Sequence, residues 1–499
     1  MKKQFRLKLF AAIWLFLAPQ PGKGFALLGP YADWMQQTNG FRFAGDIGGP
    51  MDLGEEYRWN VPLLTYGFDQ SFLDYFGSNG VAAVEQAFQI LNDLPPASSL
   101  NLEDYSTNLP RGNFLAEVEQ VLDLKTATLR ALVEQLGLAQ PTRNIFVLRQ
   151  WDPIFERLPS NYQWPEGIIP TNVLQRNFDP ELLVPSRTVN DSTFGGDATW
   201  WPPAQGQYFD IEEYIINPLQ IYYSAVADQN LFYGKYFDGL SADDAGGLRY
   251  LLHTNNVNQE SLLPDVRGTA GGTNFVNAAQ RPGVNKINFI RQSFDASSQQ
   301  WSPVTNQYTD TYWTNGQVVQ QSLERVVTRP DFLFCTGDTG AGYSASLSVL
   351  RSGTSNWQNN GGLGELGPGV IRPPVRFVFN KFGPAIATDE YLQEAYFYNS
   401  GQSRWASFDE TTNSPIVYPI EGFFETNQWT VRFRMYSPDY TFEWHPAIPV
   451  QGKALLQTST NLAAWLTLSS VTNVGAVTEW FHWKAQSTQV QRYFRVIPE

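Results

Sequence analysis

The spacing of apolar residues changes about halfway along the chain, and this change restricts the fold more than any other feature of the sequence. Between residues 114 and 136, apolar residues recur at steps of three, four and seven, which keeps one face of a helix apolar. After about residue 270 this spacing fades, and runs such as 375–380 and 430–436 alternate apolar and polar residues, as half-buried strands do. The sequence therefore predicts an α+β fold, with a mixed α/β first half and a β-rich second half.

Shorter elements complete the first half. Residues 60–68 and 144–149 have the composition of strands, and residues 81–91 carry apolar side chains at helical spacing. A length of 499 residues is typical of roughly three domains. We expect an α/β domain over residues 27–270, a β-rich region over 271–425 and a C-terminal β-module over 426–499.

The first 26 residues have the pattern of a secretory signal peptide. Four basic residues between Lys2 and Lys8 precede the apolar run 9–18, and Gly24 and Ala26 are small residues at the −3 and −1 positions of a cleavage site. Ten apolar residues are too few to span a bilayer, which takes about 20. The sequence therefore predicts a signal peptide over residues 1–26, no stable membrane span after its removal, and a protein that is secreted or lies in the periplasm or cell envelope.

Composition excludes several kinds of partner and site. The chain has 34 Lys and Arg against 48 Asp and Glu, a net charge of −14, and it has no basic stripe, so nucleic acid is not an expected partner. A single cysteine, Cys335, excludes an intrachain disulfide framework and a cysteine-based zinc finger. Because Cys335 ends the apolar run 332–335, we expect a small buried side chain there rather than a reactive thiol.

Two segments of the first half resemble zincin metallopeptidases of the matrixin kind. The strand and helix over residues 59–91 resemble the opening of such a domain, and residues 240–252 are similar to its closing helix. In that helix Ser241 would be the N-cap, with Asp243 and Asp244 in the first turn, although any well-capped amphipathic helix can have this sequence. The resemblance implies a zincin-like fold for residues 27–270.

The metal-binding part of that pattern is missing. A zincin carries two His at positions i and i+4 of one helix, with a Glu beside the first as general base. This chain has only His253, His445 and His482, and the stretch 210–219, where we expect the motif to fall, contains none of them. We therefore expect a degenerate zincin-like domain without a metal or other cofactor, and we assign no catalytic residue.

A secreted hydrolase of glycosides or peptides that uses paired carboxylates is the competing hypothesis. The 48 acidic residues offer many pairs, and the separation that matters is spatial. The adjacent pairs 55–56, 212–213 and 409–410 do not identify such a site, because neighbouring side chains point apart on a strand and about 100° apart on a helix.

Five tryptophans lie in polar, loop-like sequence and offer stacking surfaces for sugars: Trp200, Trp201, Trp301, Trp313 and Trp405. Taken singly, each of them is more often a core residue than a ligand contact. As a set they predict a ligand-binding face. Together with the missing metal motif, they favour an exported, non-catalytic binding or structural protein whose partner is an extracellular polysaccharide or an envelope protein.

The C-terminal end resembles a module known from other exported bacterial proteins. Residues 459–465, Ser-Thr-Asn-Leu-Ala-Ala-Trp, and the closing Arg-Tyr-Phe-Arg of residues 492–495 are typical of that small β-module, which implies a β-sandwich-like appendage. In addition, residues 31–35, 45–60, 68–72 and 407–409 resemble an uncharacterised family of exported bacterial proteins, and this resemblance spans most of the mature chain. That resemblance implies a secreted, globular unit and no particular mechanism.

Overall fold

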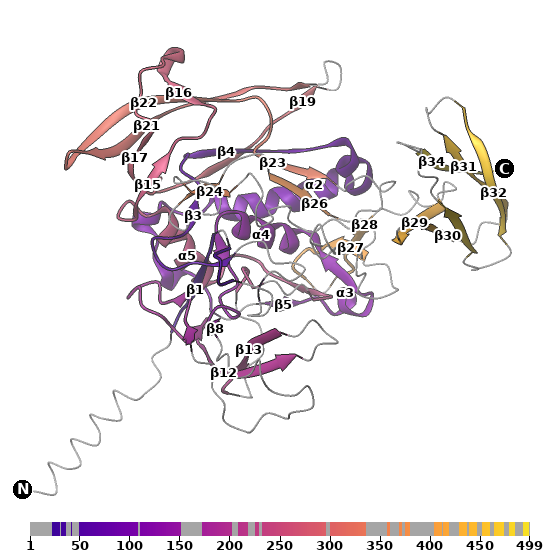
Figure 1. Ribbon diagram of the computed structural model, residues 1–499, viewed down its shortest axis with the longest axis horizontal. Coiled ribbons are helices and arrows are strands. Elements are labelled where there is room, and N and C mark those ends of the chain that lie inside the picture. The colour runs from indigo at the N-terminus through magenta and orange to yellow at the C-terminus, as the bar shows by residue number, and fades with distance from the viewer. Residues whose placement is uncertain are drawn as a thin grey trace, which may run out of the picture.

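The structure of the chain is a computed structural model, shown in Figure 1. It describes residues 22–29, 31–35, 41, 49–107, 110–150, 172–201, 208–217, 225–228, 232–295, 300–335, 357–359, 369–371, 375–379, 404–411, 413–418, 429–436, 439–446, 452–459, 464–473, 479–484 and 493–498. Residues 1–21, which hold most of the predicted signal peptide, lie outside the described residues.

Helices and strands alternate over the first half, and strands dominate the second. The helices are α2 (Gln70–Asn92), α3 (Phe114–Val118), α4 (Leu124–Gln135) and α5 (Ala242–Leu252), with short 3₁₀-helices η2 (Ala97–Ser99), η3 (Leu102–Asp104) and η6 (Thr269–Gly271). The strands up to α5 are β1 (Phe25–Gly29), β2 (Gly49–Pro50), β3 (Tyr57–Arg58), β4 (Leu63–Phe68), β5 (Arg111–Gly112), β6 (Val121–Asp123), β7 (Leu138–Ala139), β8 (Val147–Gln150), β9 (Asn172–Leu174), β10 (Asn177–Phe178), β11 (Thr188–Val189), β12 (Ser192–Trp201), β13 (Tyr208–Ile215) and β14 (Lys235–Tyr236).

The later strands are β15 (Val257–Ser261), β16 (Val266–Gly268), β17 (Ala278–Pro282), β18 (Asn288–Arg291), β19 (Phe294–Asp295), β20 (Gln300–Trp301), β21 (Val304–Thr314), β22 (Gln317–Val327), β23 (Phe332–Cys335), β24 (Trp357–Asn359), β25 (Gly369–Ile371), β26 (Val375–Val378), β27 (Arg404–Ser407), β28 (Ile416–Tyr418), β29 (Trp429–Tyr436), β30 (Asp439–Pro446), β31 (Gly452–Ser459), β32 (Leu466–Asn473), β33 (Glu479–Lys484) and β34 (Tyr493–Pro498). These elements confirm the predicted α+β class. Among the described residues, no helix is both long and apolar enough to cross a bilayer.

Helix α2 contains the predicted helix 81–91 but begins eleven residues earlier. The carboxylate of Asp69 accepts a hydrogen bond from the backbone N–H of Phe72 at 3.0 Å and so caps the first turn. Gly77 has a φ of +59°, a left-handed conformation that glycine adopts at little cost. The glycine-rich stretch 77–80 is therefore a kink within α2 rather than a break before it.

The prediction of one continuous helix over residues 114–136 is wrong in the middle of this range. The structure divides it into α3 and α4, which are separated by β6. Gln120 has a φ of +54°, and Asp123 leaves β6 to cap α4 by accepting a hydrogen bond from the N–H of Thr126 at 2.8 Å. Apolar periodicity continues through the break because β6 and α4 are both buried in the same core.

A four-stranded parallel sheet in the order β18-β4-β23-β26 joins residues from both sides of residue 270. One core cluster likewise extends from Phe25 to Tyr418. The predicted boundary at residue 270 therefore does not separate two folding units. The reason is physical, because parallel neighbours need long crossover connections and so come from distant parts of a chain.

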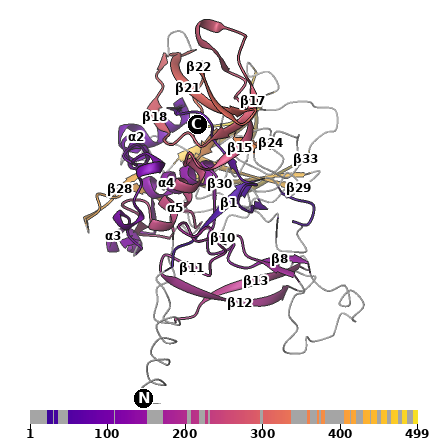
Figure 2. The same ribbon diagram turned by 90° about the vertical axis from the view of Figure 1, so that its left-hand side faces the viewer.

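A five-stranded antiparallel sheet lies at one end of the molecule, as Figures 1 and 2 show, in the order β15-β17-β21-β22-β16. Its longest strands, β21 and β22, are joined at Asn315 and Gly316, whose φ angles of +51° and +73° match the tight turn that an Asn-Gly pair favours. The alternation of this sheet puts one side on the core and one side in solvent.

Two buried ion pairs attach this sheet to the rest of the fold, and a third, between Arg281 and Asp310, joins its own strands β17 and β21. The guanidinium of Arg58 contacts Glu260 at 2.6 Å, that of Arg281 contacts Asp310 at 3.0 Å, and that of Arg325 contacts Asp331 at 2.5 Å. Although burial favours the neutral form, attraction to Asp331 and to Asp265 raises the pKa of Arg325, so this guanidinium stays charged. Charged groups thus hold the underside of the sheet, where a purely apolar contact is more usual.

Strand β1 lies in the core, which bears on the predicted cleavage after Ala26. Phe25 and Ala26 are buried and pair with β10, and Ala26 also pairs with β7. A signal peptide that ended at residue 26 would remove the first half of this strand. The rule for the −3 and −1 positions of a cleavage site depends only on the size of the two side chains. In the structure, by contrast, Phe25 and Ala26 are both buried in the core and pair with β10.

The C-terminal part contains only strands among its described residues. Strands β29, β30 and β33 form one three-stranded antiparallel sheet, and β32, β31 and β34 form another. This arrangement agrees with the predicted β-rich end of the chain.

Candidate functional site

The five candidate tryptophans lie in four different sheets and do not form one common face. Trp200 and Trp201 end β12, Trp301 lies in β20, Trp313 in β21 and Trp405 in β27. Positions 200 and 201 pair with residues of β13, and their side chains lie outside the described part of the structure. The strands therefore do not bring the five positions onto one sheet, and the ligand-binding role of Trp200 and Trp201 stays a prediction.

Trp405 is a core residue, so its prediction as a ligand contact is wrong. Its side chain is fully buried and meets the ring of Phe379 edge-on, with 5.5 Å between the ring centroids. The flanking Arg404 and Ser407 make the segment look polar, but β27 pairs with the buried strand β6. Trp301 is partly buried because its ring packs closely over Gly67, where a Cβ atom would lie 2.5 Å from it.

Trp313 belongs to the solvent side of the five-stranded sheet, which is the broadest surface that the described residues assemble. Directly opposite residues of antiparallel strands point to the same side, so Gln259, Gln280, Trp313 and Val318 form one row across four strands. We define the outer face as this row together with the other residues on its side: Val257, Ser261, Arg267, Ala278, Thr305, Gln307, Thr309, Thr311, Gln320, Ser322, Glu324 and Val326.

The outer face is almost uncharged, although the whole chain carries a net charge of −14. Its two charged residues, Arg267 and Glu324, lie directly opposite each other, and Glu324 accepts a hydrogen bond from the side-chain amide of Gln307 at 2.7 Å. The other members are amides, hydroxyls and apolar side chains. Sequence reasoning missed this face, although the alternation on both sides of Asn315-Gly316 was a signal for it.

A second group of polar side chains is buried between α4 and the loop 225–228. Arg130 and Glu134 are four residues apart on α4, and their side chains interact electrostatically. Arg130 also interacts electrostatically with Asp228. All three are more than nine-tenths buried, and the Nε atom of Arg130 makes no hydrogen bond. Burial raises the pKa of Glu134 and that of Asp228 to about 7, despite the attraction of Arg130 for Glu134 and the hydrogen bonds that Thr142 donates to Asp228.

The start of α5 fastens this group to the rest of the core. Ser241 and Asp244 form a reciprocal capping box, which confirms the predicted N-cap at Ser241. The carboxylate of Asp244 also accepts hydrogen bonds from the N–H groups of Val226 and Ala227, both at 2.9 Å. Burial raises the pKa of Asp243, whose carboxylate accepts a hydrogen bond from the N–H of Asn190 at 2.6 Å.

The pKa values near 7 make a prediction about stability. The ordinary pKa values of these carboxyls are 4.5 for Glu134 and 3.8 for Asp228, so between about pH 4 and pH 7 the folded protein holds protons that the unfolded chain has lost. These two groups therefore make the protein less stable as the pH rises from about 4 to 7, with no further loss above. We expect Glu134→Gln/Asp228→Asn to reduce this slope in urea unfolding measured from pH 5 to pH 8. Parallel curves for the variant and the parent protein would contradict these assignments.

The expected metal-binding stretch has a different structure. Residues 208–215 form β13, so this stretch is a strand where a helix was expected. His253 is the C-cap of α5, while His445 lies in β30 and His482 in β33. Within the described ranges, no three His, Cys, Asp or Glu side chains are grouped closely enough to hold a metal ion.

The adjacent acidic pairs do not form carboxylate pairs. Glu410 forms an ion pair with Lys125, whereas Asp409 accepts hydrogen bonds within its own loop. Residues 212–213 are neighbours on β13 and so point to opposite sides. Residues 55–56 accept hydrogen bonds from two different backbone N–H groups. In none of these pairs do the two carboxylates face the same point in space.

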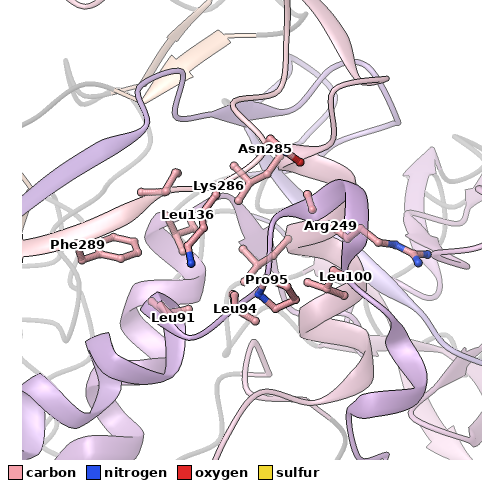
Figure 3. A pocket seen from close by; sticks show the side chains of 13 residues that line it. Leu91, Leu94, Pro95, Leu100, Leu136, Arg249, Asn285, Lys286 and Phe289 are labelled. Atoms are coloured by element: carbon pink, nitrogen blue, oxygen red, sulfur yellow. The ribbon is translucent and has the colours of Figure 1, made fainter. Parts of the chain in front are cut away.

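An apolar depression lies between the end of α2, α5 and the segment before β18 (Figure 3). Leucines and Phe289 line it, and the polar groups beside it already have partners. The ammonium of Lys286 donates a hydrogen bond to the carbonyl of Asn92 at 2.9 Å, and Arg249 donates one to the carbonyl of Pro180 at 2.8 Å. Because the lining is almost wholly apolar, we assign no ligand to this depression.

Neither the outer face nor the buried group on α4 is explained by a known relative. The function of the protein therefore has to be argued from the residues of this chain. The chain matches no protein-family model, and no curated protein or solved structure shows significant similarity to it.

Proposed function

We propose that this chain is an exported, non-catalytic protein that binds a neutral polysaccharide on the outer face of its five-stranded sheet. The single observation that carries this proposal is the combination of near-zero charge with rows of amide and hydroxyl side chains around Trp313. A neutral sugar chain offers hydroxyl groups for the amides and hydroxyls, and an apolar ring face for the indole. An anionic polymer would find no basic stripe there.

The shape of the surface suits an extended ligand. Strands β21 and β22 each have 11 residues, which corresponds to a length of about 35 Å at the usual rise per residue. On β21, the side chains of Thr305, Gln307, Thr309 and Thr311 are spaced by two residues along one line that ends at Trp313. A linear chain of several sugar units can lie along such a line.

The buried group on α4 supports the non-catalytic part of the proposal. Glu134 and Asp228 are carboxyls with pKa values near 7, a feature that a hydrolase can use, but both are more than nine-tenths buried. The guanidinium of Arg130 lies near them and is a poor metal ligand, because arginine stays protonated in proteins. The hydrolase alternative therefore has less support than the binding protein.

We further infer that the first half of the chain is related to the zincins and has lost the metal, as the sequence resemblance implies, although strands from beyond residue 270 complete its parallel sheet. The metzincin pattern has His, Glu, His, Gly and His in the order H-E-x-x-H-x-x-G-x-x-H. When the pattern is set on the end of α4, Arg130, Ala131, Glu134, Gly137 and Gln140 stand at these positions. Gly137 is the one residue of the pattern that is retained, and its φ of +113° is a conformation that glycine adopts at little cost; the Glu and the three histidines are all replaced.

The binding proposal predicts that Trp313→Ala lowers retention on insoluble neutral polysaccharides by about tenfold, because a stacked aromatic ring contributes on the order of 1–1.5 kcal/mol. The measurement is a depletion isotherm on cellulose, chitin and a neutral β-glucan. Tyr214→Ala on β13 is the matched control, since this exposed aromatic ring lies in another sheet. Because the outer face is nearly uncharged, retention should also change little between low and high salt.

Equal retention of Trp313→Ala and the parent protein on every polymer would contradict the proposed face. Retention that disappears at high salt would also contradict it, because a salt-sensitive interaction requires charged groups that the outer face lacks. Hydrolysis of any of these polymers by the parent protein, lost in Glu134→Gln, would instead support the carboxylate hydrolase.

A further inference from the structure

The outer face offers two side-chain amides to a ligand. Gln280 and Gln320 are both exposed, and neither amide takes part in a hydrogen bond with another residue that the structure describes. The amide of Gln307 differs from them, because it donates a hydrogen bond to Glu324 at 2.7 Å. A primary amide has two N–H donors and a carbonyl acceptor. Gln280 and Gln320 therefore each present both kinds of hydrogen-bonding group to solvent.

The strand register places these two amides on either side of Trp313. Gln280 on β17 lies directly opposite Trp313, which in turn lies directly opposite Val318 on β22. Gln320 follows Val318 by two residues on β22 and so lies diagonally across from Trp313. Directly opposite Cβ atoms are about 4.5–5.5 Å apart and diagonal neighbours about 7–8 Å, distances that long side chains bridge. Backbone pairing therefore fixes an indole between two amides.

Apolar groups lie beside both amides. Val318 is 58% exposed, and Thr311, directly opposite Gln320, adds a methyl group on the same side of the sheet. Ala278 is exposed two residues before Gln280 on β17. Each amide thus has an apolar neighbour within the reach of one small chemical group. Such a surface suits a ligand that carries an amide and a methyl group together.

Two classes of neutral polysaccharide differ in this group. A plain glucan presents only hydroxyls around its sugar rings, whereas a chain of 2-acetamido sugars presents a secondary amide and a methyl group on each unit. The secondary amide has one N–H donor and a carbonyl acceptor, so a glutamine amide can both donate to it and accept from it. The methyl group can pack on Val318 while the sugar ring stacks on Trp313. The acetamido group is uncharged, as the outer face nearly is.

We propose that the outer face selects polysaccharides of 2-acetamido sugars over glucans, through the amides of Gln280 and Gln320 on either side of Trp313. This inference rests on the proposed function, because it names the class of sugar that the same face binds. An acetamido sugar that covers the two amides replaces the hydrogen bonds they make to water. A glucan that covers them offers no amide in return and leaves Val318 without the methyl contact.

The test compares two soluble hexasaccharides that share the β-1,4 linkage, the hexamer of N-acetylglucosamine and cellohexaose, in calorimetric titrations of the full chain. We expect at least about tenfold tighter binding of the N-acetylated hexamer, because two amides each add a hydrogen bond. Gln280→Ala and Gln320→Ala should each reduce this preference by at least about threefold. Gln89→Ala on α2 is the matched control, since this exposed amide lies outside the five-stranded sheet.

Chitin and the glycan strands of a bacterial wall both carry acetamido groups. Depletion isotherms on chitin and on purified wall sacculi distinguish these two sources of the same chemistry. Because the outer face has no basic stripe, we expect the uncharged chitin to retain more protein than the sacculi, whose strands also carry carboxylates.

Three results would overturn the selection of acetamido sugars. In the first, the parent protein binds both hexamers equally and Trp313→Ala weakens both, which leaves the proposed function intact. In the second, the preference for the N-acetylated hexamer is unchanged in Gln280→Ala and Gln320→Ala. In the third, the protein sediments as a dimer that Gln280→Ala dissociates, so that a second copy of the chain occupies the outer face. Absence of binding to either hexamer and to every insoluble polymer would instead contradict the proposed function itself.

Discussion

Replacement of Asp331 by alanine should lower the free energy of unfolding by about 3–5 kcal/mol, because it leaves a buried arginine without its main partner. The guanidinium of Arg325 is fully buried and donates two hydrogen bonds to the carboxylate of Asp331, at 3.0 and 2.5 Å. That carboxylate also accepts a hydrogen bond from the N–H of Thr65 in β4 at 2.8 Å. The change therefore removes acceptors for two separate elements, and urea unfolding at pH 7 measures the loss.

Glu85→Ala is the matched control for this prediction. Glu85 forms an ion pair of similar length, 3.0 Å, with Arg291, but these two side chains are 39% and 45% exposed. An exposed pair contributes about 0–1 kcal/mol, so this variant should unfold close to the parent protein. The double variant Arg325→Met/Asp331→Ala should recover part of the lost stability, because it no longer buries an unpaired charge. Equal losses in Asp331→Ala and Glu85→Ala would contradict the role assigned to the buried pair.

A chain that begins at residue 27 should fail to fold cooperatively, whereas a chain that begins at residue 22 should fold. The shorter chain lacks Phe25, which is buried against the rings of Phe178 and Tyr250 at centroid distances of 6.2 and 5.4 Å. Truncation of a buried Phe to Ala alone costs about 3–5 kcal/mol, and the shorter chain also loses the pairing of β1 with β10. Near-ultraviolet circular dichroism and resistance to proteolysis distinguish the two outcomes.

Single substitutions in the full chain separate the packing effect from the truncation. Phe25→Ala should lower the free energy of unfolding by about 3–5 kcal/mol, and Phe114→Ala on α3 should change it by less than about 1 kcal/mol, because Phe114 is 70% exposed. A stable, cooperative fold for the chain that begins at residue 27 would show that the first half of β1 is dispensable.

The features that the sequence predicted correctly depend on neighbouring residues. Three predicted features each follow from a short pattern of side chains, and all three are present: the cap at Ser241, the helix over residues 81–91 and the burial of Cys335. The strands after residue 270 were also predictable, because alternation is visible within each strand. The α+β class follows from these local patterns.

The features that the sequence could not supply depend on pairing between distant segments. Trp405 looks exposed beside Arg404 until β27 is paired with β6, which lies far earlier in the chain. The outer face depends on the register that sets Gln259, Gln280 and Trp313 in one row, and no local pattern determines such a register. The electrostatic interaction between the buried side chains of Arg130 and Asp228 likewise links α4 to a remote loop.

The parallel sheet imposes an order of events on biosynthesis. β4 is synthesised long before β18, β23 and β26, and on its own it has no neighbour with which to satisfy its backbone hydrogen bonds. The early part of the polypeptide must therefore wait, incompletely folded, until the later strands emerge. Until then the apolar residues that pack against this sheet stay exposed to water, and such exposed segments are prone to aggregate.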